Sequence, residues 1–181
     1  MLISLPIISL LVCCSASTRK QDINNTPIDA LNVTRFLGRW YEIARYDHRF
    51  ERGIDYAMAE YELKRNGSIR VTNSGTKDEV FRSVTGHAFQ PDPLRNPARL
   101  RVSFFRPFYS DYRVLWLSPD YNYAIIGSKS PKYLWILSRL PDIPFEILDT
   151  MMDEITERGY SMDELIWVKQ QELDIQEMMQ L

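Results

Sequence analysis

The stretch FLGRWYEIARYDHRFERG, residues 36–53, decides how the rest of the chain is interpreted. Residues 40–46 combine aromatic, β-branched and alternating polar residues, which indicates a β-strand. Gly38 precedes this strand, where the absence of a side chain lets another segment approach closely. The charged residues 47–53 follow it and indicate a loop.

The remaining chain repeats this pattern of short strands and turn signals. Further strands are predicted at residues 56–63, 68–73, 81–89, 99–105, 112–117, 123–127 and 133–137. Asn66-Gly67 favours a tight hairpin after the second strand. Eight strands in hairpin succession predict an all-β fold, an eight-stranded antiparallel up-and-down barrel, because closure removes the exposed strand edges.

The periodicity changes after Pro144. Residues 144–158 carry apolar side chains at helical spacing, so we expect an amphipathic C-terminal α-helix packed outside the barrel. Residues 165–168 predict a short ninth strand, and residues 169–181 form a tail without a clear pattern. We therefore divide the chain into residues 1–14, a signal; 15–30, a polar tether; 31–168, the barrel with its helix; and 169–181, the tail.

The two cysteines are Cys13 and Cys14, directly after an apolar start that is too short to span a bilayer as a helix. Leucine, small residues and then cysteine are typical of a bacterial lipoprotein signal, with Cys14 as the better lipid acceptor and Cys13 as the poorer one. The alternatives are a plain secretory signal cleaved nearby or a start codon assigned too late. We expect no disulfide, because adjacent cysteines are too close to span one.

Strand alternation predicts which side chains face the barrel interior. Arg99 and Arg101 face water, so their neighbours face inward, and the same argument applies to the other strands. The predicted wall of the binding cavity is Ala44, Tyr46, Ala59, Tyr61, Val102, Phe104, Tyr112, Val114, Trp116, Trp135 and Leu137. Small inward residues, including Gly86 and Ala88, favour an open cavity; the alternative is that opposing aromatic rings fill it.

Three short motifs in order resemble the signatures of the lipocalin family. They are Gly38 and Trp40 on the first strand, Asp120 and Tyr121 before the seventh, and Arg139 at the end of the eighth. GRWYEIARYDHRFERG, VSFFRPFY and YLWILSR further resemble the bacterial outer-membrane branch, which is related to apolipoprotein D. We expect structural roles for the signature residues, with Trp40 covering the barrel floor and the Arg139 guanidinium lying over its ring.

The resemblance implies binding, storage or transport of fatty acids or lysophospholipids, with a homodimer as an option. It also implies a lipid anchor in the outer membrane facing the periplasm; the alternative is a soluble periplasmic or secreted protein. Six cations are predicted near the barrel mouth, where they could hold a head group or form a solvated rim. They are Arg49, Arg52, Lys77, Arg106, Lys129 and Lys132, opposed by Glu51, Asp78 and Glu79.

The sequence offers no catalytic constellation, so we predict a binding protein and no enzyme. His48 and His87 are the only histidines and are far apart in the pattern, so we predict neither a metal site nor a cofactor. A net charge of −2 gives no reason to expect nucleic acid as a partner. The alternatives are a filled barrel that contacts other envelope proteins and, with less support, a lipid-processing enzyme.

Overall fold

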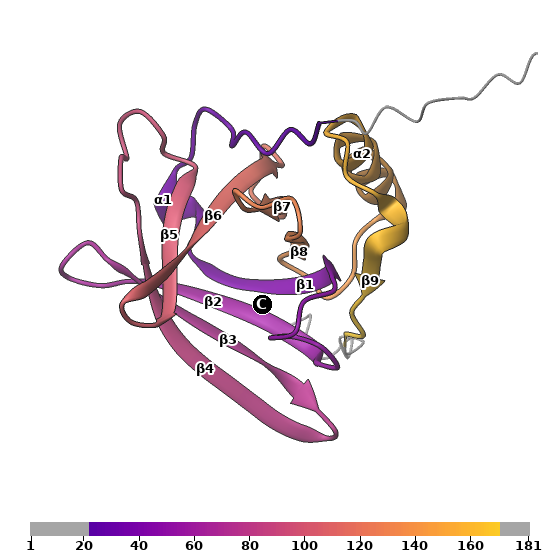
Figure 1. Cartoon of the computed structure of the whole chain (residues 1–181), viewed down its shortest axis with the longest axis horizontal. Helices are drawn as coiled ribbons and strands as arrows, with labels where there is room; N and C mark the ends of the chain where they lie inside the picture. Colours follow the sequence, from indigo (N-terminus) through magenta and orange to yellow (C-terminus); the bar gives the residue numbers. More distant parts are fainter. Residues whose placement is uncertain (1–21, 171–181) are drawn as a thin grey trace, which may run out of the picture.

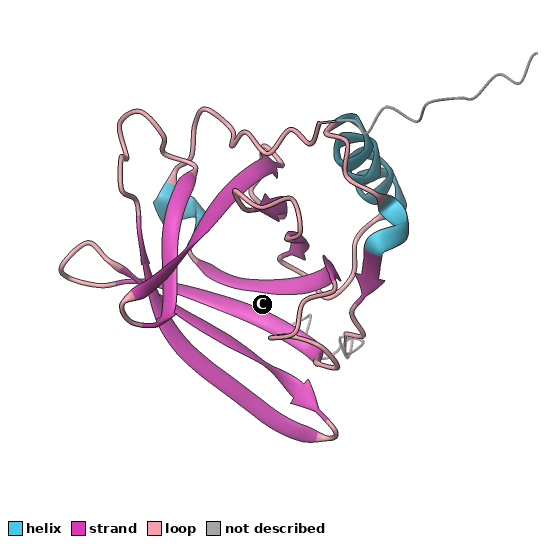
Figure 2. Cartoon of the chain, viewed as in Figure 1, coloured by secondary structure: helices cyan, strands magenta, loops and turns pink. Residues whose placement is uncertain are grey.

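The computed structural model describes residues 22–170, which form a closed barrel with one long helix outside it (Figures 1 and 2). The elements in chain order are α1 (Val33–Phe36), β1 (Gly38–Tyr46), β2 (Asp55–Leu63), β3 (Ile69–Lys77), β4 (Val80–Phe89), β5 (Arg99–Phe105), β6 (Phe108–Leu117), β7 (Tyr123–Gly127), β8 (Leu134–Ser138), α2 (Phe145–Glu157), a 3₁₀ turn (Met162–Glu164) and β9 (Leu165–Trp167). The eight-stranded barrel, the outer helix and the short ninth strand are confirmed.

The barrel closes through β1, which pairs with three strands. β1 pairs along its first half with β2, from Gly38 opposite Tyr61 to Tyr41 opposite Met58, and with β8 on its other edge. Beyond that half, β1 pairs with β9 instead of β2. β9 therefore lies beside β1 at the place where β1 and β2 separate.

The pairing of β4 with β5 is much shorter than that of β3 with β4. It runs only from His87 opposite Ser103 to Phe89 opposite Arg101, whereas β3 pairs with β4 over the whole length of the hairpin. Figure 1 shows this hairpin extending away from β5 and β6. β6 also begins at Phe108, four residues earlier than predicted, which leaves only Arg106 and Pro107 between β5 and β6.

Two apolar clusters lie on opposite sides of the barrel wall. The inner cluster draws residues from all eight barrel strands, including Trp40, Val71 and Leu100, which only the barrel interior can bring together. The outer cluster joins Met151 and Ile155 of α2 to the outer faces of β1, β6, β7 and β8. The amphipathic pattern of the helix thus reflects a real apolar partner surface on the barrel.

The predicted signal and both cysteines lie outside the described residues, as do all but two residues of the tail. The described part of the predicted tether is bound to the fold. The Asn24 and Ile28 amides donate to the carbonyl oxygens of Arg158 and Val114, and Arg113 Nη1 binds Asn25. Among residues 22–170, no helix is long and apolar enough to cross a membrane.

Gly86 is small for a reason other than leaving an open cavity. A Cβ atom there would lie 2.4 Å from the Ser103 carbonyl oxygen and 2.7 Å from the Phe104 ring. We expect Gly86→Ala to destabilise the protein by about 2 kcal/mol or more in urea unfolding, because backbone would have to move. Ser83→Ala, at an exposed position on the same strand, should change stability by less than about 0.5 kcal/mol. Equal effects would contradict the close approach.

Candidate functional site: the barrel interior

The barrel floor is closed by one tryptophan and one arginine. Trp40 is fully buried, its Nε1 donates to the Phe36 carbonyl oxygen at 2.8 Å, and the Arg139 guanidinium carbon lies 3.9 Å from its ring centroid. Arg139 donates hydrogen bonds of 2.7–3.3 Å to the carbonyl oxygens of Arg35, Phe36, Leu37, Arg39 and Tyr121. This one side chain thereby ties α1, β1 and the β6–β7 connection together.

The other two signature positions support the same floor. Gly38 has a φ of +93°, and a Cβ there would lie 3.3 Å from Arg139 Nη1, so glycine suits both the backbone and the contact. The Tyr121 hydroxyl accepts the Asn32 amide, and its ring lies under Arg35. Asp120 accepts hydrogen bonds from Ser118 and Asn122, which hold its pKa below the ordinary value and fix the turn.

Most of the predicted wall residues belong to the inner cluster. These are Ala59, Tyr61, Val102, Phe104, Tyr112, Val114, Trp135 and Leu137. Among the inward side chains, Phe104 and Trp135 lie toward the mouth and are only half-buried, whereas Ala59 and Tyr112, also half-buried, lie closer to the floor. Inward side chains that retain exposure leave the upper part of the barrel accessible from its mouth, the end opposite Trp40.

The prediction that Ala44, Tyr46 and Trp116 face inward is wrong. All three pack in the outer cluster against α2 and its flanking turn, and the Tyr46 hydroxyl donates to the Ser161 carbonyl oxygen. The cause is a pair of strand irregularities, one between Glu42 and Ala44 and one between Val114 and Trp116. An extra residue in a strand moves every later side chain to the opposite face.

The same irregularity turns Arg45 toward the interior, where it joins Glu42, which already shares the inward face with Trp40. Glu42 pairs with Leu137 in the strand register, and Arg45 pairs with Trp135, so both share a face with the inner cluster. Arg45 Nη1 lies 2.6 Å from Glu42 Oε1 in a nearly fully buried ion pair. Strict alternation places Glu42 inward with Trp40 but places Arg45 outward, so it does not predict the pair. The sequence did contain a signal for this change of face, namely the run of apolar residues around the pair. Because α2 needs an apolar surface on the outside of β1, some of these residues must face outward.

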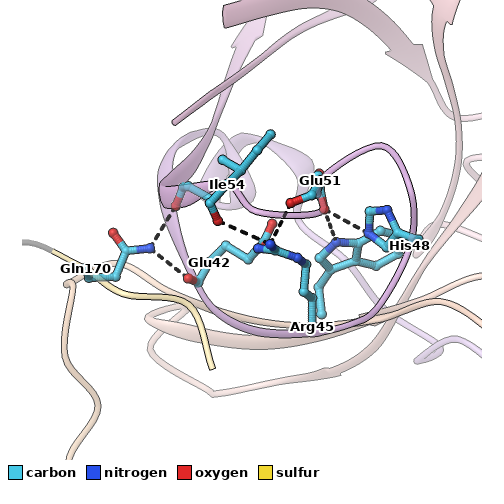
Figure 3. A network of polar contacts seen from close by, with 8 residues as sticks. Glu42, Arg45, His48, Glu51, Ile54 and Gln170 are labelled. Carbon is cyan, nitrogen blue, oxygen red and sulfur yellow. Dashed lines mark hydrogen bonds and ion pairs between the residues drawn. The ribbon is translucent and has the colours of Figure 1, made fainter. Parts of the chain in front are cut away.

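The connection between β1 and β2, residues 47–54, folds inward onto this ion pair (Figure 3). Arg45 Nη2 donates to the carbonyl oxygens of Glu51 and Ile54 at 2.6 and 3.2 Å. Glu51 Oε2 accepts from Trp135 Nε1 at 3.0 Å and lies 2.8 Å from His48 Nε2. Glu51, predicted to oppose the rim cations, thus points into the barrel instead.

Burial and neighbouring charges shift the two carboxyl groups in opposite directions. Burial, reinforced by the charge of Glu51 and opposed by Arg45, raises the pKa of Glu42 to about 8. Burial also acts to raise the pKa of Glu51, but the contacts with His48, Trp135 and Arg45 outweigh it and hold that pKa below its ordinary value. Glu42 therefore holds a proton and is neutral, whereas Glu51 is ionised, so the two carboxyl groups together carry one negative charge beside the positive charge of Arg45.

Gln170, which the sequence divides off as tail, completes the network. Its Nε2 donates to the carbonyl oxygens of Glu42 and Ala57 at 2.7 and 3.0 Å, bridging β1 and β2 where their ladder ends.

Deeper in the interior, the Tyr61 and Tyr112 hydroxyl groups lie 3.0 Å apart. Burial raises the pKa of Tyr61 to about 12 and the pKa of Tyr112 well above its ordinary value, so both hydroxyl groups are neutral donors and acceptors.

Polar features outside the barrel offer less shelter to a ligand. A hollow of about 420 Å³ is lined by Tyr46, Asp47, Lys132 and Glu164, and one of about 200 Å³ lies beside Arg139. Both are open to solvent and lie outside the inner cluster, so neither suits an acyl chain. Within residues 22–170, no three histidine, cysteine or acidic side chains gather as metal ligands.

Comparisons with known proteins agree with this geometry. A family model described as a lipocalin-like domain matches residues 31–170. The chain is 43% identical over 164 residues to outer membrane lipoprotein Blc of Citrobacter freundii, covering 89% of this chain and 90% of that protein. It is 34% identical over 143 residues to mouse apolipoprotein D, covering 74% of each. Insecticyanin from the tobacco hornworm Manduca sexta has the same fold, with a TM-score of 0.69 at 20% identity over 82% of this chain and 86% of that one.

Proposed function

The chain belongs to the lipocalin family, and from that premise we propose that it binds and carries single-chain lipids, fatty acids or lysophospholipids, in the upper part of its barrel. The observation that carries the proposal is the inner wall. Apolar and aromatic side chains above a closed floor remain half-buried, so an acyl chain could cover them. Each buried CH₂ group contributes about 0.8 kcal/mol, enough over a long chain to offset the cost of ordering it.

A cell-envelope location and a lipid anchor belong to the same proposal. The support is the name of the bacterial relative, an outer membrane lipoprotein, together with the cysteine pair that follows the apolar start. Cys14, or with a poorer match Cys13, would carry the lipid. We further propose that the protein works without chemical turnover, because members of its family generally bind or transport their ligands. A homodimer remains part of the proposal without an assigned interface.

We expect Trp135→Ala to weaken lipid binding at least about tenfold, because the indole contributes a large inward apolar surface. Isothermal titration of the purified full chain with a lysophospholipid and, separately, a fatty acid of equal chain length would measure the affinity. Trp167→Ala is the matched control, since Trp167 is 55% exposed on β9. Saturable binding that both variants share with the wild type would exclude the barrel interior as the site. No binding of either lipid would favour a filled barrel that contacts other proteins.

A further inference from the structure

The mouth of the barrel carries most of the exposed phenylalanine side chains. In an up-and-down barrel, the connections β1–β2, β3–β4, β5–β6 and β7–β8 share the end opposite the floor. Six phenylalanines of the described residues are exposed, and four of them lie at this end: Phe50 at 68%, Phe81 at 67%, Phe105 at 73% and Phe108 at 77%. Exposed aromatic side chains concentrated at one end indicate an interaction surface.

Each of these phenylalanines has an arginine within two residues in the chain. Arg49 precedes Phe50, with its guanidinium carbon 5.3 Å from the ring centroid, and Arg82 follows Phe81. In the β5–β6 hairpin, Phe105 and Phe108 are paired across the strands, so both rings share one face, and Arg106 lies in the turn between them. The β7–β8 connection adds Lys129 and Lys132. Asp78 and Glu79 are exposed in the β3–β4 turn at the same end, but the mouth as a whole presents aromatic rings among more cations than anions.

This combination fits a lipid surface better than a second copy of the chain. Aromatic rings insert at the boundary between head groups and acyl chains, and arginines bind phosphate oxygens there. Two copies joined by these mouths would place arginines of one against arginines of the other, which is unfavourable. The charge pattern therefore identifies an anionic partner.

We propose that the mouth of the barrel docks directly on a membrane containing anionic phospholipids, with Phe50, Phe81, Phe105 and Phe108 at its surface. The barrel interior then opens toward the membrane, and a lipid can pass between the two without crossing bulk water. This last step rests on the proposed function; the docking itself does not. The loop 47–54, which carries Phe50, lies at the same entrance.

The orientation test uses two variants of the full chain that each add one tryptophan to the four native ones, whose quenching in the otherwise unchanged protein is subtracted. All proteins carry Cys13→Ser and Cys14→Ser so that no acyl anchor is attached. Phe108→Trp reports the mouth, and Leu94→Trp reports the opposite end, where Leu94 is 94% exposed in the β4–β5 connection. Vesicles contain brominated phosphatidylcholine, alone or mixed with phosphatidylglycerol. We expect quenching at position 108 at least about threefold greater than at position 94, increased by phosphatidylglycerol and reduced by high salt. Equal quenching at both positions, or none at either, would overturn the proposal.

The transfer test compares Phe105→Ser/Phe108→Ser with Leu94→Ser, which removes an even more exposed apolar side chain from the closed end. A fluorescent lysophospholipid moves from the same vesicles to the protein. We expect the double variant to slow transfer about tenfold and the control to match the wild type, while both bind the lipid from water unchanged. Unchanged transfer in the double variant would contradict docking. Conversion of a dimer to a monomer without quenching would instead assign the mouth to a second copy. Failure of all proteins to bind the lipid from water would refute the proposed function and leave the quenching result valid.

Discussion

Arg139→Ala should lower the free energy of unfolding by about 3–5 kcal/mol, one of the two largest effects expected in this protein. The guanidinium donates to five carbonyl oxygens and covers the Trp40 ring at 3.9 Å. A hydrogen bond from a charged donor contributes about 1.5–3 kcal/mol, and water can replace some of these bonds because Arg139 is half-buried. The expected sum is therefore smaller than five full hydrogen bonds.

The measurement is urea unfolding followed by circular dichroism. Arg39→Ala is the matched control, because that side chain is exposed on the same end of β1 and only its backbone carbonyl is used; we expect a change below about 0.5 kcal/mol. Arg139→Lys should restore little, since an ammonium group on a flexible stem cannot reach acceptors spread over α1, β1 and the β6–β7 connection. Wild-type stability of Arg139→Lys would show that charge alone, rather than the planar fork, holds the floor.

The floor is the part of the site that the sequence predicts best. Gly38, Trp40 and Arg139 each have one role that follows from their chemistry and from the order of the strands. A ring covers the floor, a cation covers the ring, and a missing side chain makes room for both. Alternation also placed Tyr61 and Val102 correctly, because no irregularity separates them from the neighbouring Glu60, Glu62, Arg99 and Arg101 that set the parity. Leu137 lies on β8, which pairs regularly with β7.

The mouth end of β1 is predicted poorly because a strand irregularity between Glu42 and Ala44 separates it from the floor. An extra residue near Ile43 turns Ala44 and Tyr46 outward and Arg45 inward. A rule that assigns alternate residues to opposite faces cannot detect such an insertion. Every later residue of the strand is then assigned to the wrong face. The apolar outer face that α2 requires does carry the information, but only when helix and strands are considered together.

The polar network matters because it couples the entrance of the barrel to its wall. Arg45 holds the loop 47–54 through two carbonyl oxygens, and Glu51 reaches Trp135 on β8. A ligand that contacts Trp135 therefore also meets the loop that partly closes the entrance (Figure 3). Such a network is stable only while its charges are balanced, because an unpaired buried charge is strongly unfavourable.

We expect the stability of the wild-type protein to fall as the pH rises from about 5 to about 9, and the Glu42→Gln variant to lose most of this dependence. Burial raises the pKa of Glu42 from 4.5 to about 8, so in this range the folded state holds a proton that the unfolded state has released. Stability contributed by a raised pKa is complete below the unfolded value and is lost as the pH rises through the folded value. At about 1.4 kcal/mol per pKa unit the full shift corresponds to roughly 5 kcal/mol; sharing of the proton with Glu51 reduces this to an expected loss of about 2–4 kcal/mol.

Urea unfolding at several pH values measures this loss. His87 gives a slope of opposite sign, because partial burial, with Arg106 and Lys64 nearby, lowers its pKa; both proteins share that contribution, so their difference isolates Glu42. The lowered pKa of Glu51 contributes stability that is lost only as the pH falls below the range measured. A wild type that is equally stable at pH 5 and pH 9 would mean that Glu42 remains ionised beside Arg45. The entrance of the barrel would then hold two carboxylates, and protonation could not regulate it.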